Sequence, residues 1–102
     1  MEDAVGPVLR MCDEVDLVIR AIEDDNPADS VEIVDRGAYV RVQRPGFLRV
    51  TRASLERHLG AGFQMSQLES IMSAFAGRIR TSSDEVVWHL QTASASSQEN
   101  VR

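Results

Sequence analysis

The residues best able to do chemistry in this chain are two histidines and one cysteine. A zinc or diiron site needs imidazoles and carboxylates that converge on one point, as Glu-x-x-His repeats do on facing helices. His58 follows Glu56 by only two residues. His89 follows Glu85 by four residues in a predicted strand, where that spacing spans about 13 Å and is too long to share a metal ion. Each histidine is therefore interpreted as an ordinary surface or half-buried residue.

Nucleophilic and cofactor chemistry find equally little support in the sequence. Cys12 has no histidine near it, and no Gly-x-Ser-x-Gly motif occurs. Residues 60–62 read Gly-Ala-Gly, but Met65 stands where a dinucleotide-binding loop needs its third glycine, and a predicted helix precedes them instead of a strand. We therefore expect no catalytic residues, no cofactor and no metal, and we interpret Cys12 as a small packed side chain.

A possible RNA-binding motif lies at residues 36–42, Arg-Gly-Ala-Tyr-Val-Arg-Val. These residues echo the RNP1 motif of RNA-recognition domains but are one residue short. Only Tyr39 is available to stack on a base, and aromatic residues make up 5% of this acidic chain. We expect no nucleic-acid partner, and a small RNA-binding-like α+β module remains the alternative hypothesis.

Length and composition indicate one domain. The chain has 102 residues, of which 43% are hydrophobic, and this is enough to bury a modest core. A lone cysteine cannot form an intramolecular disulfide. The sequence contains neither a signal-peptide pattern nor an apolar run of about 20 residues. We expect a soluble, cytoplasmic protein with no membrane partner.

The net charge of −5 conceals an uneven distribution of charged residues. The balance is −9 for residues 1–35, +6 for residues 36–80 and −2 for residues 81–102, and every basic residue is arginine. The acidic third would repel a polyanion, so the pattern favours a surface that docks on another protein. Two solvated faces without a partner are the alternative explanation.

The N-terminal third is predicted to contain one short apolar segment and one helix. Residues 5–11 are apolar but are interrupted by Gly6-Pro7, and residues 1–12 are interpreted as an N-terminal arm or an edge strand. Residues 14–24 place apolar side chains at the i, i+3, i+4, i+7 spacing of an amphipathic helix. Asp25-Asn26-Pro27 ends that helix, because proline excludes the helical conformation at the preceding residue.

A meander of strands is predicted for the middle of the chain. Residues 31–34 and 38–43 are rich in β-branched and aromatic side chains and are separated by a turn sequence that contains Gly37. Residues 47–50 then form a third strand. We expect these three strands to lie side by side in one antiparallel sheet.

Two helices are predicted in the C-terminal half. Thr51 is a good N-cap for a helix over residues 51–59. Ser66 and Glu69 form the capping box of a longer helix over residues 66–77, which a glycine ends. The stripe of this longer helix that is expected to point inward consists of Leu68, Ile71, Met72 and Phe75.

The end of the chain completes the predicted fold. Residues 79–81 and 86–90 form a closing strand or hairpin, and the polar, Ser-rich residues 92–102 form a disordered tail. The main domain then spans residues 5–91. The predicted fold is a single compact α+β domain with an antiparallel sheet and about three helices, in the rough order β-α-β-β-β-α-α-β.

The predicted helix over residues 66–77 has an unusual outward face. At about 100° per residue, the side opposite the apolar stripe carries only very small residues. An exposed helix face normally carries long charged side chains, whereas small residues let the backbone of a partner approach closely. A surface helix that happens to be Ser-rich is the alternative. The residues of this small face are Ser66, Ser70, Ser73, Ala74 and Gly77.

Several short motifs occur in a fixed order along the chain. They are Asp25-Asn26-Pro27, Asp35-Arg36-x-Ala38-Tyr39-Val40-Arg41, Thr51-Arg52-x-x-Leu55-Glu56, Leu59-Gly60-x-x-Phe63-x-Met65, Leu68-Glu69 and Ser73-x-Phe75-Ala76-Gly77. With this set the chain resembles effector proteins of soluble diiron multicomponent monooxygenases, closest to the toluene and alkene monooxygenase branch. The resemblance covers roughly residues 5–90.

The resemblance implies a cofactor-free effector, or coupling, protein that is not itself an enzyme. It would bind near the diiron site of a separate bacterial hydroxylase and couple electron transfer to hydroxylation or epoxidation of an aromatic or alkene hydrocarbon. It would also associate functionally with ferredoxin and reductase components, and we expect a monomer when the chain is free.

The spacing of small residues and the resemblance both place the docking site on the second C-terminal helix and the residues directly after it. The resemblance places the segment that ends in Phe75-Ala76-Gly77 against the hydroxylase. The predicted hydroxylase-docking residues are Asn26, Ser66, Ser70, Ser73, Ala74, Gly77 and Arg78.

Overall fold

The computed structural model describes residues 3–90 of the chain, so the predicted tail at residues 92–102 lies outside the described residues. Over the described range the order of elements is β-α-β-β-β-α-α-β-β-β. The elements are β1 (Ala4–Arg10), α1 (Val15–Asp24), β2 (Glu32–Asp35), β3 (Tyr39–Pro45), β4 (Phe47–Thr51), α2 (Arg52–Leu59), α3 (Met65–Ile71), β5 (Met72–Ala76), β6 (Arg78–Thr81) and β7 (Glu85–His89). The predicted α+β domain with three helices and antiparallel strands is confirmed.

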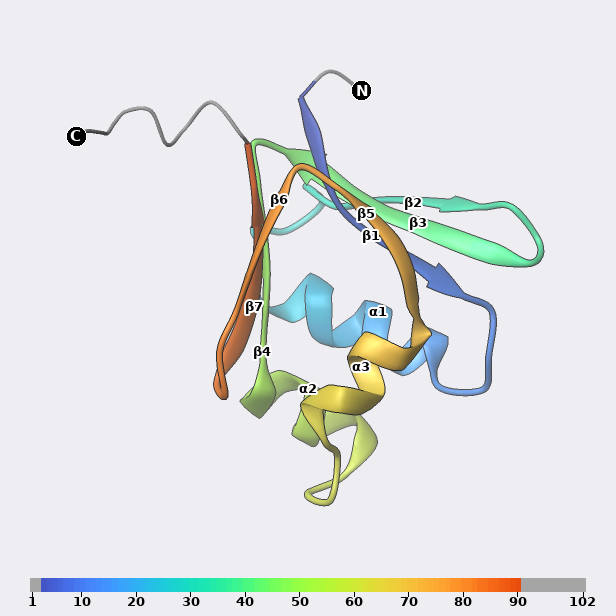
Figure 1. Cartoon of the computed structure of the whole chain (residues 1–102), viewed down its shortest axis with the longest axis vertical. Coiled ribbons are helices and arrows are strands. Elements are labelled where there is room, and N and C mark those ends of the chain that lie inside the picture. The colour runs from blue at the N-terminus through green and yellow to red at the C-terminus, as the bar shows by residue number, and fades with distance from the viewer. Residues whose placement is uncertain (1–2, 91–102) are drawn as a thin grey trace.

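The strands form two antiparallel sheets, ordered β2-β3-β1-β5 and β4-β7-β6. The chain passes from the first sheet to the second at two places, each through a single bend residue. Gly46 lies between β3 and β4, and Gly77 lies between β5 and β6. Figure 1 shows the sheets meeting in an L, with the helices in the angle between them. The prediction that residues 47–50 continue the meander was wrong, because Gly46 turns β4 away from β3 and β4 pairs with β7.

Strand β1 lies between β3 and β5, so residues 5–11 do not form the predicted edge strand. A proline is unusual in a central strand because it has no N–H for the ladder. Here the register with β3 omits Gly6 and Pro7. A Cβ atom at Gly6 would lie 2.0 Å from the carbonyl oxygen of Val42, so only glycine allows the two backbones to approach so closely.

The hydrophobic core lies between the helices and the inner faces of the sheets. The helical spacing correctly predicted that Val15, Val18 and Ile22 of α1 are buried, whereas Ile19 is half-buried and Ala21, outside the predicted stripe, is buried. Leu55 of α2 is also fully buried. Trp88, in the central strand of the second sheet, is fully buried, and its indole N–H has no hydrogen-bond partner among the described residues. The largest fully buried apolar side chains are Trp88, Leu9, Ile22, Leu48, Leu55 and Leu68.

Helix α3 is shorter than predicted and is followed by a strand. It covers Met65–Ile71, and its capping box uses Gln64 and Gln67, two residues earlier than predicted. Met72–Ala76 then pair along β1 as strand β5 instead of continuing the helix. The ladder with β1 gives this segment backbone partners from a distant part of the chain, and such tertiary pairing outweighs a weak intrinsic helix preference.

Candidate docking surface

Six of the seven predicted docking residues are exposed and follow one another along a short part of the chain. Two of them lie on α3, two on β5, one at the bend after β5 and one at the start of β6. They do not form one face of a single helix, because α3 ends at Ile71. In Figure 1 they follow the chain from α3 along β5 to the bend into β6, so they are spread along this segment. They are Ser66, Ser70, Ser73, Ala74, Gly77 and Arg78.

The last turn of α3 is attached to the first sheet by an arginine. The guanidinium of Arg10, on β1, donates a hydrogen bond to the carbonyl oxygen of Ser70. This bond supplies a partner for one of the carbonyls that a helix leaves free at its C-terminus. The junction between α3 and β5 is therefore held against β1 from both sides of Ile71.

Strand β5 is the uncharged edge of the two sheets. Each sheet has two edge strands, which are β2 and β5 in the first and β4 and β6 in the second. Proteins commonly protect exposed edges with charged residues, because a bare edge invites pairing or contact with another chain. β2, β4 and β6 each contain at least one Asp, Glu or Arg, whereas β5 reads Met-Ser-Ala-Phe-Ala.

A β-bulge at Ser73 gives β5 its local shape. Ala74 pairs with Val8 and Met72 pairs with Leu9, so Ser73 is an extra residue without its own partner in the ladder. Its hydroxyl donates a hydrogen bond to the carbonyl oxygen of Val8 at 3.3 Å. A bulge disrupts the ladder and bends the strand. Ser73 therefore contributes to the shape of the predicted surface as well as to its polarity.

Phe75 is exposed, contrary to the prediction that its ring points inward. Its relative exposure is 44%, the highest among the large hydrophobic residues that are exposed in the described part of the chain. Because residues 72–76 are a strand at the sheet edge, the helical spacing that assigned Phe75 to the core does not apply there. Phe75 lies between Ala74 and Ala76 in the sequence, and their side chains point to the opposite face of the strand. An exposed aromatic ring of this kind can enter a pocket of a partner. The predicted docking residues did not include Phe75, although the resemblance placed the segment that contains it against the hydroxylase.

The bend at Gly77 leaves no room for a side chain. Gly77 has φ +89°, and a Cβ atom there would lie 2.6 Å from the carbonyl oxygen of His89 and 2.6 Å from Cγ1 of Val5. Only glycine combines this backbone conformation with such close packing. Gly77 therefore fixes the direction in which β5 leads into β6.

Asn26, the seventh predicted docking residue, is buried and lies away from β5 in the sequence, at the corner after α1. Its Nδ2 donates hydrogen bonds to the carbonyl oxygens of Ile22 (2.6 Å) and Arg49 (2.8 Å). Its Oδ1 accepts a hydrogen bond from the backbone N–H of Arg49 at 3.2 Å. With all these groups engaged, Asn26 acts by holding β4 against α1.

The two acids before Asn26 attach α1 to helix α2. Asp25 accepts hydrogen bonds from the backbone N–H (2.7 Å) and hydroxyl (3.0 Å) of Thr51 and from the hydroxyl of Ser54 (2.8 Å). Thr51 in turn caps α2 by accepting a hydrogen bond from the backbone N–H of Ser54, as its N-cap role predicted. Asp25 therefore fixes the start of α2.

Asp24 reaches the other end of α2. Its carboxylate lies 2.9 Å from a guanidinium nitrogen of Arg57 and 2.7 Å from Nε2 of His58. The hydrogen bond with His58 holds the pKa of Asp24 below its ordinary value, and the charge of Arg57 acts in the same direction. His58 therefore contacts a carboxylate on α1, which agrees with its interpretation as an ordinary surface residue.

The remaining side chains that could take part in catalysis or metal binding do not cluster. His89 places Nδ1 3.1 Å from the carbonyl oxygen of Leu90, and Cys12 is a half-buried free thiol. Within residues 3–90, no three His, Cys, Asp or Glu side chains cluster in a way that could hold a metal ion. No helix in the described range is long and apolar enough to cross a membrane.

An exposed, uncharged edge strand is a surface through which one protein can contact another. The model of the MmoB/DmpM family matches residues 3–89. The effector subunit of the alkene monooxygenase system of Xanthobacter autotrophicus (strain ATCC BAA-1158 / Py2) is 42% identical over 91 residues, which cover 89% of this chain and 90% of that protein. The chain belongs to the MmoB/DmpM family. It is an effector component of a multicomponent monooxygenase and not the catalytic component.

Solved structures share the fold at lower identity. A chain in a structure of the phenol hydroxylase–regulatory protein complex superposes with a TM-score of 0.76 at 22% identity, covering 86% of this chain and 99% of that one. Regulatory protein B of soluble methane monooxygenase superposes with a TM-score of 0.69 at 22% identity, covering 93% of this chain and 70% of that one. The fold is therefore shared with regulatory protein B of soluble methane monooxygenase and with a chain in the phenol hydroxylase–regulatory protein complex.

Proposed function

We propose that this effector binds the diiron hydroxylase of a bacterial alkene-type hydrocarbon monooxygenase and couples electron transfer to oxidation of the substrate. The alkene monooxygenase effector subunit that is 42% identical supports an alkene as the substrate class. The fold shared with a chain from a hydroxylase–regulatory protein complex supports a hydroxylase as the partner. Ferredoxin and reductase components would supply the electrons to that hydroxylase.

The observation that carries the proposed docking site is the uncharged exposed strand β5. The contact would centre on Ser73, Ala74 and Phe75, with Gly77 and Arg78 at its end. An exposed aromatic side chain on an uncharged strand is a suitable anchor for an interface hot spot, where it enters a pocket of the partner. The free edge of β5 and the serine hydroxyls could also exchange hydrogen bonds with the hydroxylase.

The effector would act by selecting one conformation of the hydroxylase. A protein that binds one state more tightly than another shifts the population toward that state, without taking part in the chemistry. Coupled turnover by hydroxylase, ferredoxin and reductase should therefore rise as effector is added, up to about one equivalent, and then level off or fall. A linear increase far beyond equimolar effector would contradict this mechanism.

The docking site is tested by Ala74→Arg, which adds a long charged side chain to the exposed strand. We expect a large loss of stimulation and of affinity for the purified hydroxylase. The melting temperature should stay within a few degrees, corresponding to about 1 kcal/mol or less at an exposed site. Ser73→Trp should behave in the same way.

The matched control is Ala53→Arg, which makes the same change at an exposed position on α2, away from β5. This variant should stimulate the hydroxylase like the wild type. If Ala74→Arg also binds and stimulates normally, β5 is only a solvated strand and the proposed site is wrong.

A further inference from the structure

The outer face of the second sheet carries a second group of exposed residues. Cross-strand partners in an antiparallel sheet place their side chains on the same face. Phe47 pairs with His89, and His89 pairs with Arg78. In the next row on that face, Arg49 pairs with Val87, and Val87 pairs with Arg80. The opposite face of the same strands carries Leu48, Trp88 and Ile79, which belong to the core or pack against it.

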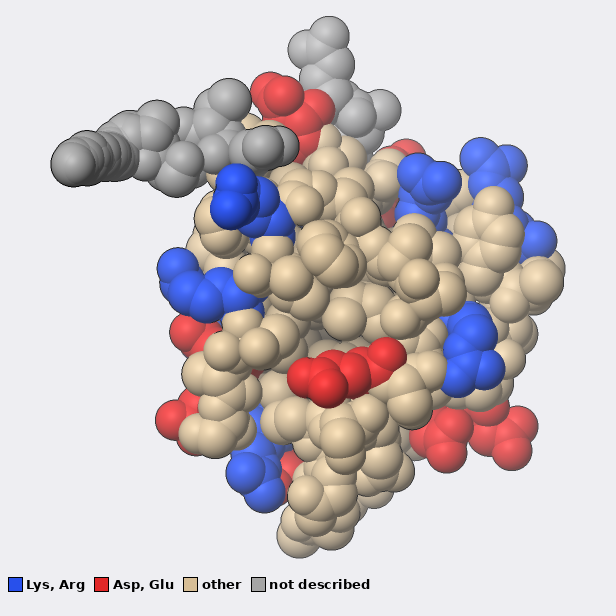
Figure 2. Space-filling model, in the orientation of Figure 1, with Lys and Arg blue, Asp and Glu red and all other residues tan. Residues whose placement is uncertain are grey.

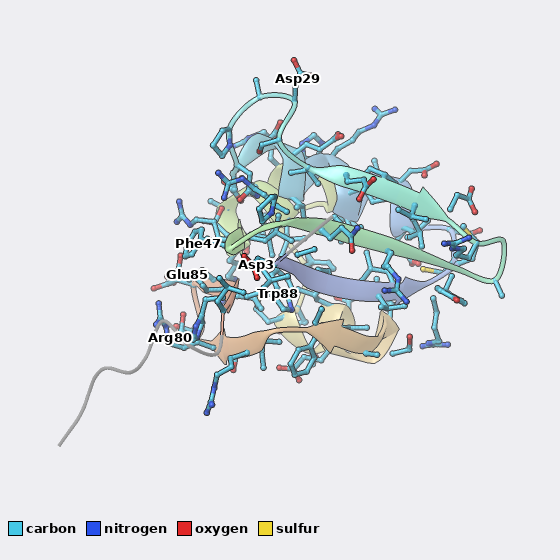
Figure 3. All side chains as sticks on the ribbon, turned by 90° about the horizontal axis from the view of Figure 1, so that it is seen from above. Asp3, Asp29, Phe47, Arg80, Glu85 and Trp88 are labelled. Carbon is cyan, nitrogen blue, oxygen red and sulfur yellow. The ribbon has the colours of Figure 1, made fainter. Side chains whose placement is uncertain are left out.

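Figure 3 separates these two faces. Phe47, Glu85 and Arg80 lie along the outer side of the second sheet, whereas Trp88 lies on the inner side. The helices and the first sheet lie toward the inner side in Figure 1, so no described element covers the outer face. The face is therefore open to a partner.

The arginines on this face are supported by the sheet beneath them. Val87 is only 2% exposed although it lies on the outer face, between Arg49 and Arg80. Long side chains that lay their apolar stems over a small apolar residue keep their charged ends at the surface. The burial of Val87 fits such an arrangement, in which Arg49 and Arg80 would lose less freedom when a partner binds.

The positive charge on the outer face is only partly neutralised within the described residues. Arg49 forms an ion pair with Glu85 at 3.0 Å. Arg78 and Arg80 are exposed, and neither has an acidic group within 4.0 Å in residues 3–90. Figure 2 shows basic side chains on the left flank, over the second sheet, with acidic side chains beside them. A separate basic group lies near the β2–β3 hairpin on the right. This local excess stands out in a chain whose net charge is −5.

This cationic face is continuous with strand β5. The chain passes from β5 into β6 through Gly77 alone, so Arg78 borders the uncharged strand and Arg80 lies two residues further on. Phe47, 41% exposed, adds an aromatic side chain in the same row as Arg78. Arginine and aromatic residues are the types enriched in the core of protein interfaces.

We propose that the outer face of the second sheet, centred on Phe47, Arg78 and Arg80, binds an acidic surface of the hydroxylase beside the site that takes β5. This inference rests on the proposed function and extends it. The uncharged strand supplies close contact, and the cationic face attracts and orients the effector before that contact forms. Charges at the rim of an interface act mainly on the association rate and on its dependence on salt.

The test compares Arg80→Glu with Arg36→Glu, which makes the same charge reversal at an exposed residue between β2 and β3. Association of each variant with immobilised, purified hydroxylase is followed at rising concentrations of sodium chloride. We expect Arg80→Glu to slow association by about 5-fold or more at low salt, and we expect this difference to disappear at high salt. Arg36→Glu should slow association less than about 2-fold under the same conditions.

A second variant, Phe47→Ala, examines the aromatic part of the face. It should accelerate dissociation and leave the association rate nearly unchanged, because an apolar contact acts after encounter. Circular dichroism and melting temperature of each variant establish that the fold is intact.

The outcomes separate this inference from the proposed function. If the wild type binds the hydroxylase but Arg80→Glu and Arg36→Glu behave alike, the cationic face is not part of the contact. If the wild type does not bind the hydroxylase, the proposed function itself fails and this inference fails with it. Affinity for single-stranded RNA that depends on Arg80, with hydroxylase kinetics unchanged, would also overturn the inference, in favour of a nucleic-acid partner.

Discussion

The corner after α1 and strand β5 use their side chains in opposite ways. In the corner, Asp24, Asp25 and Asn26 are each hydrogen-bonded to a different part of the segment that runs from β4 to the end of α2. In β5, the Ser73 hydroxyl donates a hydrogen bond to the carbonyl oxygen of Val8, and Phe75 is exposed. The polar side chains of the corner are hydrogen-bonded within the fold, whereas the surface of β5 is exposed.

Residue type alone therefore does not distinguish a docking residue from a structural one. Asn26 and Ser73 are both small polar residues that sequence reasoning assigned to docking. Asn26 has its donor and acceptor groups engaged with the backbone of α1 and β4. A side chain so engaged leaves nothing to offer a partner, and its loss should be felt in stability.

The largest effect is expected from Asn26→Asp, which keeps the shape of the side chain but removes the amide donor. Two carbonyl oxygens, of Ile22 and Arg49, would lose their partner and face a buried carboxylate. We expect a loss of about 3 kcal/mol or more in the free energy of unfolding, measured by urea denaturation. The same amide-to-acid change at Gln43, whose bond to Glu32 is exposed, should cost about 1 kcal/mol or less. Equal losses in the two variants would remove the contrast between corner and surface.

A smaller loss is expected from Asp25→Ala. The change removes the acceptor for Thr51 and Ser54 at the start of α2, while the Thr51 cap itself remains. We expect a loss of about 2 kcal/mol in unfolding free energy, with stimulation of the hydroxylase retained below the melting temperature. Asp35→Ala, which removes one exposed bond to the Gly37 N–H, should cost less. A selective loss of stimulation in a stable Asp25→Ala protein would assign the corner to docking.

Phe75→Ala addresses β5 directly. Because the ring is 44% exposed, we expect a loss of about 1 kcal/mol or less in stability and a clear decrease in affinity for the hydroxylase. Leu68→Ala on the buried side of α3 should cost about 3 kcal/mol. A loss of stability from Phe75→Ala as large as that from Leu68→Ala would indicate that the Phe75 ring packs in the core, and would contradict its proposed role as an anchor.

The smallest effect concerns the pH dependence of Asp24. Its pKa in the folded chain lies below the ordinary value of 3.8, so the ionised form stabilises the fold at higher pH. That contribution should be fully present above the ordinary pKa and should be lost as the pH falls through the lower folded value. The melting temperatures of wild type and Asp24→Asn should therefore differ slightly at pH 7 and converge in strong acid. A difference that persists unchanged at low pH would show that the charge of Asp24 is not its source.

Local sequence signals predicted the elements that are fixed by nearby residues. The apolar spacing of residues 14–24 gave α1, Thr51 gave the start of α2, and turn residues gave the β2–β3 and β6–β7 hairpins. The prediction of helix at Met72–Ala76 was wrong because this segment pairs with β1, which lies more than 60 residues earlier in the chain. A helical spacing can occur in a strand by chance, and only the distant partner decides between the two.

The residues of the candidate site were predicted in part, but the helix face from which they were predicted does not exist in the structure. Small residues from Ser66 to Gly77 indicated an unusual surface, and the residues chosen there are exposed. Their common helix face does not exist, so Phe75 was assigned to the core when it lies on the surface. The cationic face could not be predicted, because Phe47, Arg80 and His89 come together only through the order of strands in the second sheet.

The burial of Trp88 gives this chain a built-in optical reporter. It is the single tryptophan of the sequence, it is fully buried, and its indole N–H has no hydrogen-bond partner among the described residues. An indole in such apolar surroundings emits at shorter wavelength than one in water, so unfolding should shift the emission to the red. Trp88 lies on the inner side of the second sheet, and Phe75 and Arg80 are exposed, so docking should leave that emission unchanged. Intrinsic fluorescence can therefore follow the folding of each effector variant before it is mixed with the hydroxylase.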